Sequence, residues 1–259
     1  MPVTLSLAGR VALITGGSRG IGAATVRLFA QAGARVFFNY RHAKSEAEAL
    51  VKEIGDSACA AMACELTGTK TAAKLVSGCR ARFGSIDLLV ANHGVWAAED
   101  RAIDTMADEQ WQHTLAVNLD AVFALVKHAV AAMKETAGPQ SPAHIVLISS
   151  TAGQRGEALH TDYAASKGAL ISMVKGLATE LAPHHIYVNC VAPGWVDTDM
   201  SRPALDDPET AKKILRTIPL GRVATVEEIA APILFLCTPQ AGFITGEVFN
   251  VNGGAVLVG

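Results

Sequence analysis

Short, continuously apolar runs alternate along this chain with longer segments that have the hydrophobic pattern of helices. The runs are RVALIT (10–15), ARVFFNY (34–40), SACAAMAC (57–64), IDLLVAN (86–92), AHIVLISS (143–150), IYVNCVAP (186–193) and EVFNVNG (247–253). Their length and their content of β-branched residues predict strands, and the segments between them predict helices.

The apolar character of these runs is continuous, which is typical of strands that are buried on both faces. Strands that alternate with helices are joined by right-handed crossovers, so they form a parallel sheet. We therefore predict an α/β fold: a doubly wound parallel sheet of about seven strands with helices on both faces.

Composition is compatible with one large core. The chain has 259 residues, of which 50% are hydrophobic, and we expect a single domain over residues 1–259. The net charge of -2 lacks the basic excess that nucleic acids or anionic membranes usually require. The five cysteines are odd in number and include no C-x-x-C pair, so we expect reduced core thiols rather than disulfides or a zinc site.

Nothing in the sequence indicates export or a membrane. Met1 to Thr4 lead toward the first strand without a basic-then-apolar leader. No uninterrupted apolar stretch reaches the roughly 18 residues of a membrane span. We expect a cytoplasmic protein.

Glycines follow the first predicted strand in the segment TGGSRGIG, which leads into a helical pattern. Gly16, Gly20 and Gly22 leave room for a sharp turn, for a phosphate group and for close packing of the helix against the strand. The N–H groups at the helix start would then bind an anion. The spacing G-x-x-x-G-x-G departs from the common dinucleotide fingerprint, and a glycine-rich turn can also be a simple loop.

Tyr163 and Lys167 are four residues apart in a helical pattern, and so lie on one face of the helix. A lysine ammonium there is expected to lower the pKa of the tyrosine and to make its proton available for catalysis. Ser150 lies thirteen residues upstream of Tyr163 at the end of a strand. Taken alone, the Tyr-Lys pair is also compatible with a solvated helix stripe.

Six motifs occur in a recognisable order and spacing: TGGSRGIG, ANHG, the asparagine of VNL, the serine pair, YAASK and APGWVDTDM. On these motifs the chain resembles the classical short-chain dehydrogenase/reductase family over nearly its whole length, and it is similar to 3-oxoacyl-(acyl-carrier-protein) reductases. The resemblance implies a Rossmann-type fold and hydride transfer between a nicotinamide cofactor and a carbonyl or secondary alcohol.

The resemblance also implies the catalytic roles. Tyr163 would be the acid or base, and Ser150 would donate a hydrogen bond to the substrate oxygen. Lys167 would assist Tyr163 and bind the nicotinamide ribose. Asn118 would lie at a helix irregularity whose carbonyl binds water in a proton path.

The cofactor-binding residues that the resemblance implies follow the carboxyl ends of the strands. They are Gly16, Ser18, Arg19, Gly20, Ile21, Gly22, Tyr40, Arg41, Glu65, Leu66, Asn92, Gly94, Tyr163, Lys167, Pro193, Gly194, Val196 and Thr198. The second strand ends in Tyr40 and Arg41 instead of an acidic residue. We therefore expect NADP(H), its 2′-phosphate held by Arg19 and Arg41 with Ser18 or Asn39 as neutral donors, while NAD(H) remains possible.

The segments expected to form the substrate pocket are mixed in character. We select Trp96, Gln154, His160, Trp195 and Met200 as its lining. His93, where the family has a small residue, is expected to pack or hydrogen-bond, since no metal-ligand spacing surrounds it.

Several alternatives remain open from the sequence. The protein could reduce 3-oxoacyl groups on a carrier protein, although the basic docking residues of that family would fall at Ser141 and His184. It could also bind NADP(H) as a non-catalytic sensor. An epimerase or dehydratase would need a larger substrate domain. The resemblance further implies a homo-oligomer, a dimer or a tetramer, with Leu170, Met173, Val174 and Leu177 facing either a second subunit or the sheet.

Overall fold

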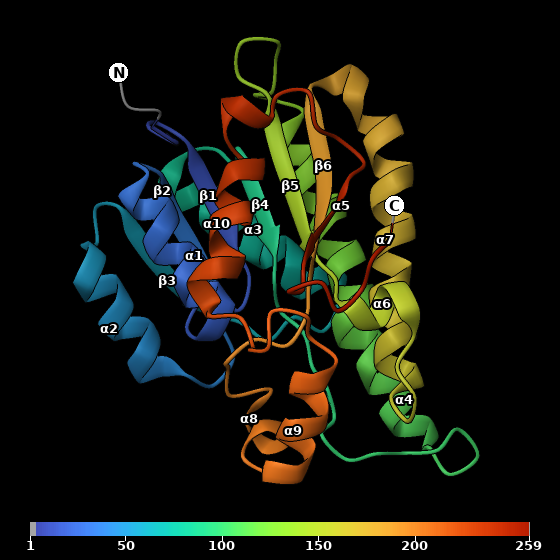
Figure 1. Cartoon of the computed structure of the whole chain (residues 1–259). Coiled ribbons are helices and arrows are strands. Elements are labelled where there is room, and N and C mark those ends of the chain that lie inside the picture. Colours follow the sequence, from blue (N-terminus) through green and yellow to red (C-terminus); the bar gives the residue numbers. More distant parts are fainter. Residues whose placement is uncertain (1–3, 259) are drawn as a thin grey trace.

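The computed structural model describes residues 4–258 and contains one seven-stranded parallel sheet, shown in Figure 1. The strands are β1 (Val11–Ile14), β2 (Arg35–Tyr40), β3 (Cys59–Ala63), β4 (Leu88–Ala91), β5 (Ala143–Ile148), β6 (Ile186–Pro193) and β7 (Val248–Val251). Each predicted run forms a strand, so the predicted sheet is confirmed. The expected lack of an export leader concerns residues 1–3, which lie outside the described residues.

The strand order is β3-β2-β1-β4-β5-β6-β7. The chain therefore places β2 and β3 on one side of β1, and then crosses over to place β4 on the other side. β1 pairs with β2 on one side and with β4 on the other, and all three run parallel. Where the order reverses, the connections leave the carboxyl ends of β1 and β4 in opposite directions and open a crevice. This position is the expected place for a ligand.

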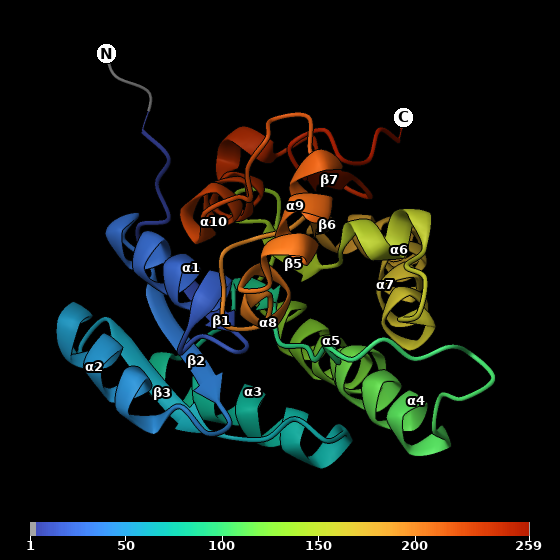
Figure 2. The same ribbon diagram turned by 60° about the horizontal axis from the view of Figure 1, so that its bottom comes forward.

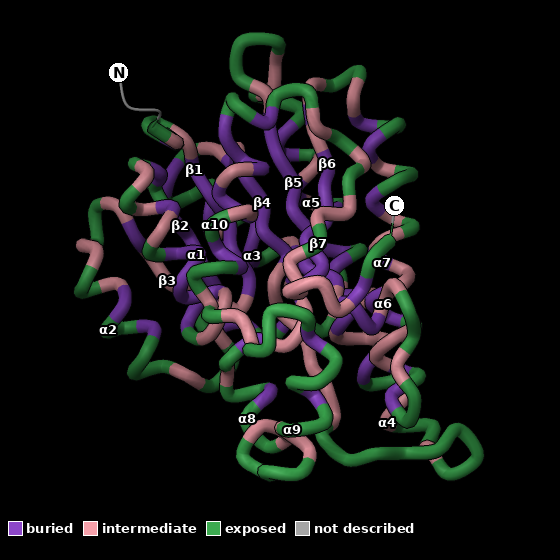
Figure 3. The backbone as a smooth tube through the Cα atoms, viewed as in Figure 1, coloured by how far each residue is buried: buried purple, intermediate pink, exposed green. Residues whose placement is uncertain are grey.

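Helices cover both faces of the sheet, as Figure 2 shows. One face carries α1 (Gly20–Gln31), α2 (Lys44–Ile54) and α10 (Val226–Leu236), and the other carries α3 (Thr69–Phe83), α5 (Ala121–Met133) and α7 (Thr161–Leu181). Their apolar faces exclude water from the central strands: β1, β4 and β5 are buried along their length in Figure 3, whereas the edge strands β3 and β7 are partly exposed.

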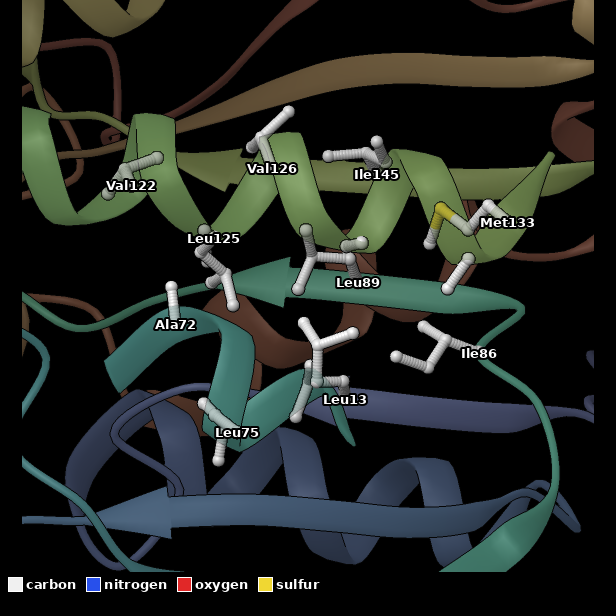
Figure 4. Close-up of a cluster of buried hydrophobic side chains, with 14 of the residues drawn as sticks. Leu13, Ala72, Leu75, Ile86, Leu89, Val122, Leu125, Val126, Met133 and Ile145 are labelled. Carbon is white, nitrogen blue, oxygen red and sulfur yellow. The ribbon is translucent and has the colours of Figure 1, made fainter. Parts of the chain in front are cut away.

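Two apolar cores result, one on each side of the sheet. Figure 4 shows part of the core beneath α3 and α5, where Leu13 and Leu89 of the strands meet Leu75 and Leu125 of the helices. Leu170 and Val174 of α7 belong to this core and are buried, so these two residues face the sheet.

The remaining elements lie mostly at the carboxyl ends of the strands. They are α4 (Asp108–Leu115), a π-helical turn (Ala116–Asp120), α6 (Thr151–Arg155), α8 (Arg202–Leu205) and α9 (Pro208–Arg216), together with 3-10 turns at Ala182–His184 and Pro239–Ala241. In Figure 1, α8 and α9 project beyond the sheet on the same side as α4.

One helical run is long and apolar enough, by length and composition alone, to cross a membrane. It spans Asp108–Met133 and has a mean hydropathy of 1.5 over its most apolar window. Core helices of soluble proteins meet the same criterion, and here α5 packs Val122 and Leu125 into the core beneath the sheet.

The five cysteines are free and buried. Burial raises the pKa of the Cys59, Cys79 and Cys237 thiols to about 12, so these thiols are protonated at neutral pH. This agrees with the prediction of reduced core thiols.

Candidate active site

The glycine turn between β1 and α1 has a backbone that other residues would strain. Gly16 and Gly20 have φ values of 64° and 54°. A Cβ on Gly22 would lie 2.1 Å from the carbonyl oxygen of Gly16, so the helix start closes directly onto the turn. No side chain caps the first turn of α1, which leaves its N–H groups available to an anion.

Polar side chains from neighbouring strand ends fix this turn. The Asn92 amide donates hydrogen bonds to the carbonyl oxygens of Thr15 at 3.0 Å and Gly16 at 3.4 Å. Asn39 accepts from the Gly16 N–H at 3.1 Å and donates to the Cys64 carbonyl at 2.7 Å. The expectation that Asn39 offers a donor to a phosphate is therefore wrong, because its buried amide joins the strand ends.

Tyr163 and Lys167 lie one turn apart near the start of α7. The Lys167 ammonium nitrogen lies 5.7 Å from the centre of the Tyr163 ring and donates to the Ile148 carbonyl at 2.8 Å. The Ser149 hydroxyl donates to the Lys167 carbonyl at 2.8 Å. The carboxyl end of β5 thus holds both the side chain and the backbone of the lysine.

Burial dominates the ionisation of this pair. It raises the pKa of Tyr163 to about 12 because the phenolate loses its solvation; a hydrogen bond with Ser150 acts in the opposite direction, and the charge of Glu157 adds to the rise. Burial also lowers the pKa of Lys167 to about 8. The prediction that Lys167 lowers the tyrosine pKa is contradicted, because loss of solvation is the largest effect.

Asn118 lies in the π-helical turn between α4 and α5 and is fully buried. Its amide oxygen accepts from the Val95 N–H at 2.8 Å, and its amide nitrogen donates to the Val95 carbonyl at 2.9 Å and to the Ser166 hydroxyl at 3.1 Å. Ser166 in turn donates to the Tyr163 carbonyl at 2.7 Å. The helix irregularity implied by the family resemblance is therefore present and is connected to α7.

Ser150 is the N-cap of α6, and its hydroxyl oxygen accepts from the Ala152 N–H at 3.1 Å. The Ser150 hydroxyl also acts to lower the pKa of Tyr163, which places these two side chains at the same site. Gly94 completes the arrangement, because a Cβ there would lie 3.2 Å from the Asn118 amide oxygen and 3.3 Å from the Lys167 ammonium nitrogen. The four predicted catalytic side chains thus meet beyond β4 and β5.

The two arginines expected at the adenosine ribose are paired with carboxylates. Arg41 lies 3.1 Å from Glu65, and Arg19 lies 3.6 Å from Asp199. All four side chains are about half exposed or more, and such ion pairs contribute at most about 1 kcal/mol. A phosphate group could therefore displace either carboxylate.

The other predicted cofactor residues are distributed around the same crevice. Ser18 and Val196 are buried, and Leu66 is buried in the core. Thr198 lies over the glycine turn, because a Cβ on Gly20 would lie 3.5 Å from its methyl carbon. Ile21, Tyr40, Pro193 and Gly194 occupy the first turn of α1 and the ends of β2 and β6.

Three of the predicted pocket residues form an aromatic cluster, which we define as Trp96, His160 and Trp195. The Trp96 ring centre lies 4.9 Å from that of His160 and 6.0 Å from that of Trp195. Asp100 lies 3.2 Å from His160 Nε2 and anchors the cluster.

The other two predicted pocket residues, Gln154 and Met200, do not belong to this aromatic cluster. The Gln154 amide nitrogen donates to Asn250 of β7 at 2.6 Å, which ties this side chain to the sheet edge. Met200 follows β6 and is 44% exposed.

These residues fit a nicotinamide dinucleotide. The glycine turn lacks the Cβ atoms that would fill it, the helix start presents uncapped N–H groups, and both adjoin the crevice where strand order reverses. Among residues 4–258, no group of three His, Cys, Asp or Glu side chains is placed to hold a metal ion.

Comparison with known proteins agrees with this geometry. A family model described as enoyl-(acyl carrier protein) reductase matches residues 16–256. The 3-oxoacyl-(acyl-carrier-protein) reductase FabG of Vibrio cholerae is 35% identical over 98% of this chain and 100% of its own length. The chain is a short-chain dehydrogenase/reductase.

Solved structures of short-chain dehydrogenases/reductases have the same fold. A glucose/ribitol dehydrogenase-type member from Brucella melitensis superposes with a TM-score of 0.89 at 32% identity, covering 99% of this chain and 100% of that one. A 3-ketoacyl-(acyl-carrier-protein) reductase from Brucella melitensis, solved with NADH, gives a TM-score of 0.89 at 32% identity and covers 97% and 100%. This chain is accordingly an NAD(P)-dependent reductase of the family that acts on CH–OH groups.

Sequence reasoning missed several residues that position the site of this short-chain dehydrogenase/reductase. Ser149 holds the backbone at Lys167, and Ser166 connects Asn118 to Tyr163. Buried Asp162 accepts hydrogen bonds from Thr114 at 2.7 Å and Gln110 at 3.2 Å, joining α4 to α7. The sequence offered one signal for these residues: each is polar and lies at a strand end or on a helix face that is expected to be buried.

Proposed function

We propose that this protein is an NADP(H)-dependent oxidoreductase that interconverts a small carbonyl compound and its secondary alcohol, with Tyr163 as the acid/base. The observation that carries the proposal is the convergence of Tyr163, Lys167, Ser150 and Asn118 beside the glycine turn. This combination supplies a proton donor next to a dinucleotide site.

The proposed mechanism follows from the protonation states. Reduced nicotinamide, when bound, supplies the hydride for the carbonyl carbon. Ser150 donates a hydrogen bond to the oxygen on which charge develops, and Tyr163, protonated at neutral pH with a pKa of about 12, transfers its proton to that oxygen. The Lys167 ammonium stabilises the phenolate that forms, and the Asn118 turn lies on the path by which the proton returns. In oxidation these steps reverse.

We assign the cofactor pyrophosphate to the turn of Gly16, Gly20 and Gly22 and the nicotinamide ribose to Lys167. The segment from Pro193 to Thr198 would hold the carboxamide. The preference for NADP(H) rests on Arg41 and Arg19, both of which can exchange a weak carboxylate partner for the 2′-phosphate. NAD(H) is the secondary cofactor.

The substrate pocket is assigned to the aromatic cluster with Gln154 and Met200. Two tryptophans provide an apolar wall, and His160 provides a polar edge, so a moderately polar ketone or hydroxy compound fits. Reduction of a 3-oxoacyl group on a carrier protein is the second candidate, favoured by the name of the Vibrio cholerae relative. Ser141 and His184 stand where that function would need basic docking residues.

The first experiment replaces Tyr163 by Phe. Carbonyl reduction should fall by about 10²- to 10⁴-fold because the proton donor is lost, while the dissociation constant of NADPH should stay nearly unchanged. Both are measured by NADPH absorbance and fluorescence with a panel of free ketones and carrier-bound 3-oxoacyl thioesters. Tyr187→Phe is the matched control, since the Tyr187 ring packs edge-on against His144 at the other end of the sheet.

Undiminished turnover by the Tyr163 variant would overturn the proposed role. If the unmodified protein binds NADPH but oxidises it with no carbonyl in the panel, the sensor function replaces the enzymatic one. Selective turnover of the carrier-bound thioester would establish the second candidate.

We also propose the domain organisation, the cellular location and the oligomeric state. We take residues 1–259 as one cytoplasmic domain that acts as a homo-oligomer on small molecules. Exposed Phe123 on α5 and Phe243 near the start of β7 support an oligomeric contact. Mass measurement in solution distinguishes monomer, dimer and tetramer.

A further inference from the structure

His93 occupies the junction between the glycine turn and the proton-transfer groups, and the mechanism above gives it no role. It lies two residues after the end of β4, and a Cβ on Gly16 would lie 3.3 Å from its Cα. Its other neighbour, Gly94, adjoins Asn118 and Lys167. A change at His93 can therefore reach both the cofactor turn and the lysine.

The hydrogen bonds of Thr15 determine which ring nitrogen of His93 carries the proton. The Thr15 hydroxyl oxygen accepts from the N–H groups of Asn92 at 3.0 Å and of His93 at 3.2 Å, which occupies both of its lone pairs. Its own proton then goes to His93 Nδ1 at 2.8 Å, a better distance than the 3.4 Å to the Val90 carbonyl. The neutral ring therefore carries its proton on Nε2.

This Nε2–H group is buried and has no hydrogen-bond partner among the described residues. Buried donors without a partner are rare and usually serve a function. The Val117 carbonyl of the π-helical turn favours the protonated ring, and the charge of Lys167 opposes it, so both elements face the imidazole. Burial is the largest effect and lowers the pKa of His93 to about 4, which keeps the ring neutral.

We propose that His93 is a positioning residue for proton transfer, whose neutral imidazole links the glycine turn, through Thr15, to the π-helical turn and places a polar N–H group near Lys167. In this arrangement the His93 ring is hydrogen-bonded to the glycine turn through Thr15 and faces the Val117 carbonyl and the Lys167 charge with its other nitrogen. The inference rests on the proposed roles of Tyr163 and Lys167.

The first test observes the ring directly and does not depend on turnover. With ¹⁵N-labelled histidine in the full chain, the His93 nitrogen shifts should report the Nε2–H tautomer, neutral from pH 8 to about pH 5. Thr15→Val should abolish this single tautomer, because it removes the proton offered to Nδ1. An Nδ1–H tautomer, or a charged ring at pH 7, would overturn the inference.

The second test compares His93→Leu with His93→Gln in carbonyl reduction. Leucine removes the Nε2–H group and the Nδ1 acceptor of Thr15, and should lower kcat about tenfold, the effect of one lost buried hydrogen bond, with an unchanged KM for NADPH. Leucine also makes the surroundings of Lys167 more apolar, which should lower the pKa of Lys167 further. The alkaline limb of the pH–activity profile, expected near pH 8, should therefore move to lower pH. Glutamine keeps a donor and should restore both.

The other titratable groups that face Lys167 do not contribute to this limb of the pH–activity profile. The Cys190 thiol on β6 has its pKa raised to about 11 and Tyr163 has its pKa raised to about 12, so neither titrates near pH 8. A purely structural role would lower kcat and stability without moving the limb. An unmoved limb in the leucine variant, or no recovery with glutamine, would refute the role; if the leucine variant does not fold, the tautomer measurement decides. Failure of Tyr163 as acid/base would appear separately in Tyr163→Phe.

Discussion

Tyr163 and Lys167 lie on one face of α7, and burial moves their pKa values in opposite directions, to about 12 and about 8. The two changes move the pKa values apart, and neither residue is the main cause of the other's change. A protonated phenol beside an ammonium at neutral pH is suited to donating a proton during reduction. At the residue scale, loss of solvation therefore prepares the site for reduction more than direct pairing does.

Arg41 provides the residue-scale prediction for cofactor choice. Arg41→Ser should weaken NADPH binding by about 10- to 100-fold, because a hydrogen-bonded charge on the 2′-phosphate is lost, and should leave NADH binding nearly unchanged. Glu65→Gln should strengthen NADPH binding, since it releases the guanidinium 3.1 Å away. Fluorescence titration measures both cofactors.

Arg80→Ser is the matched control for this prediction, because Arg80 of α3 forms a similar exposed ion pair with Glu135, just after the end of α5. Equal weakening of NADPH and NADH by Arg41→Ser would contradict the assignment of Arg41 to the 2′-phosphate.

At the element scale, α6 rests directly on the backbone of α7. A Cβ on Gly153 would lie 2.6 Å from the Lys167 carbonyl carbon, and one on Gly168 would lie 3.2 Å from the Gly153 carbonyl oxygen. Because Ser150 begins α6 and Lys167 lies at the contact, the packing of these two helices sets the position of the serine relative to the lysine. Two glycines thus determine the geometry of the site without contacting the reacting atoms.

Gly153→Ala should separate these helices and destabilise the protein by about 1–3 kcal/mol, the usual cost of overpacking. Carbonyl reduction should fall with it, as Ser150 shifts. Gly176→Ala is the matched control in α7, because a Cβ there meets nothing within 4 Å; it should stabilise the helix by up to about 1 kcal/mol. Urea unfolding measures both variants, and equal stability of the two would refute the contact argument.

At the scale of the whole molecule, two buried histidines couple folding to pH. His93 follows the carboxyl end of β4 and His144 lies near the amino end of β5, and burial lowers the pKa of each to about 4. The unfolded chain, with histidine pKa values near 6.5, binds more protons between these limits. Stability is therefore full above about pH 6.5 and is lost as pH falls toward 4.

The expected loss of unfolding free energy over this range is on the order of 2 kcal/mol per histidine. His144→Phe should remove about half of the pH dependence, because the ring keeps its packing against Tyr187 but no longer titrates. Urea unfolding at several pH values from 7 to 4 measures the slope. An unchanged slope in this variant would contradict the assigned ionisation.

Much of the fold was predictable because its signals are local. The seven strands followed from continuous apolar runs, and the glycine turn followed from residue type. The roles of Asn39 and Leu170 were not fixed in this way, since a polar side chain at a strand end can face a ligand or a neighbouring strand, and an apolar helix face can meet the sheet or another subunit. The hydrogen bonds of Asn39 and the burial of Leu170 decided these cases.

The sequence by itself determined the element types, the parallel sheet and the candidate chemistry of Tyr163 and Lys167, because periodicity and side-chain type act over a few neighbouring residues. Only the tertiary structure decided the direction of the tyrosine pKa, the partners of Arg41 and the environment of His93. These depend on the solvent and charges that distant segments bring around each group, and chain spacing alone does not specify them.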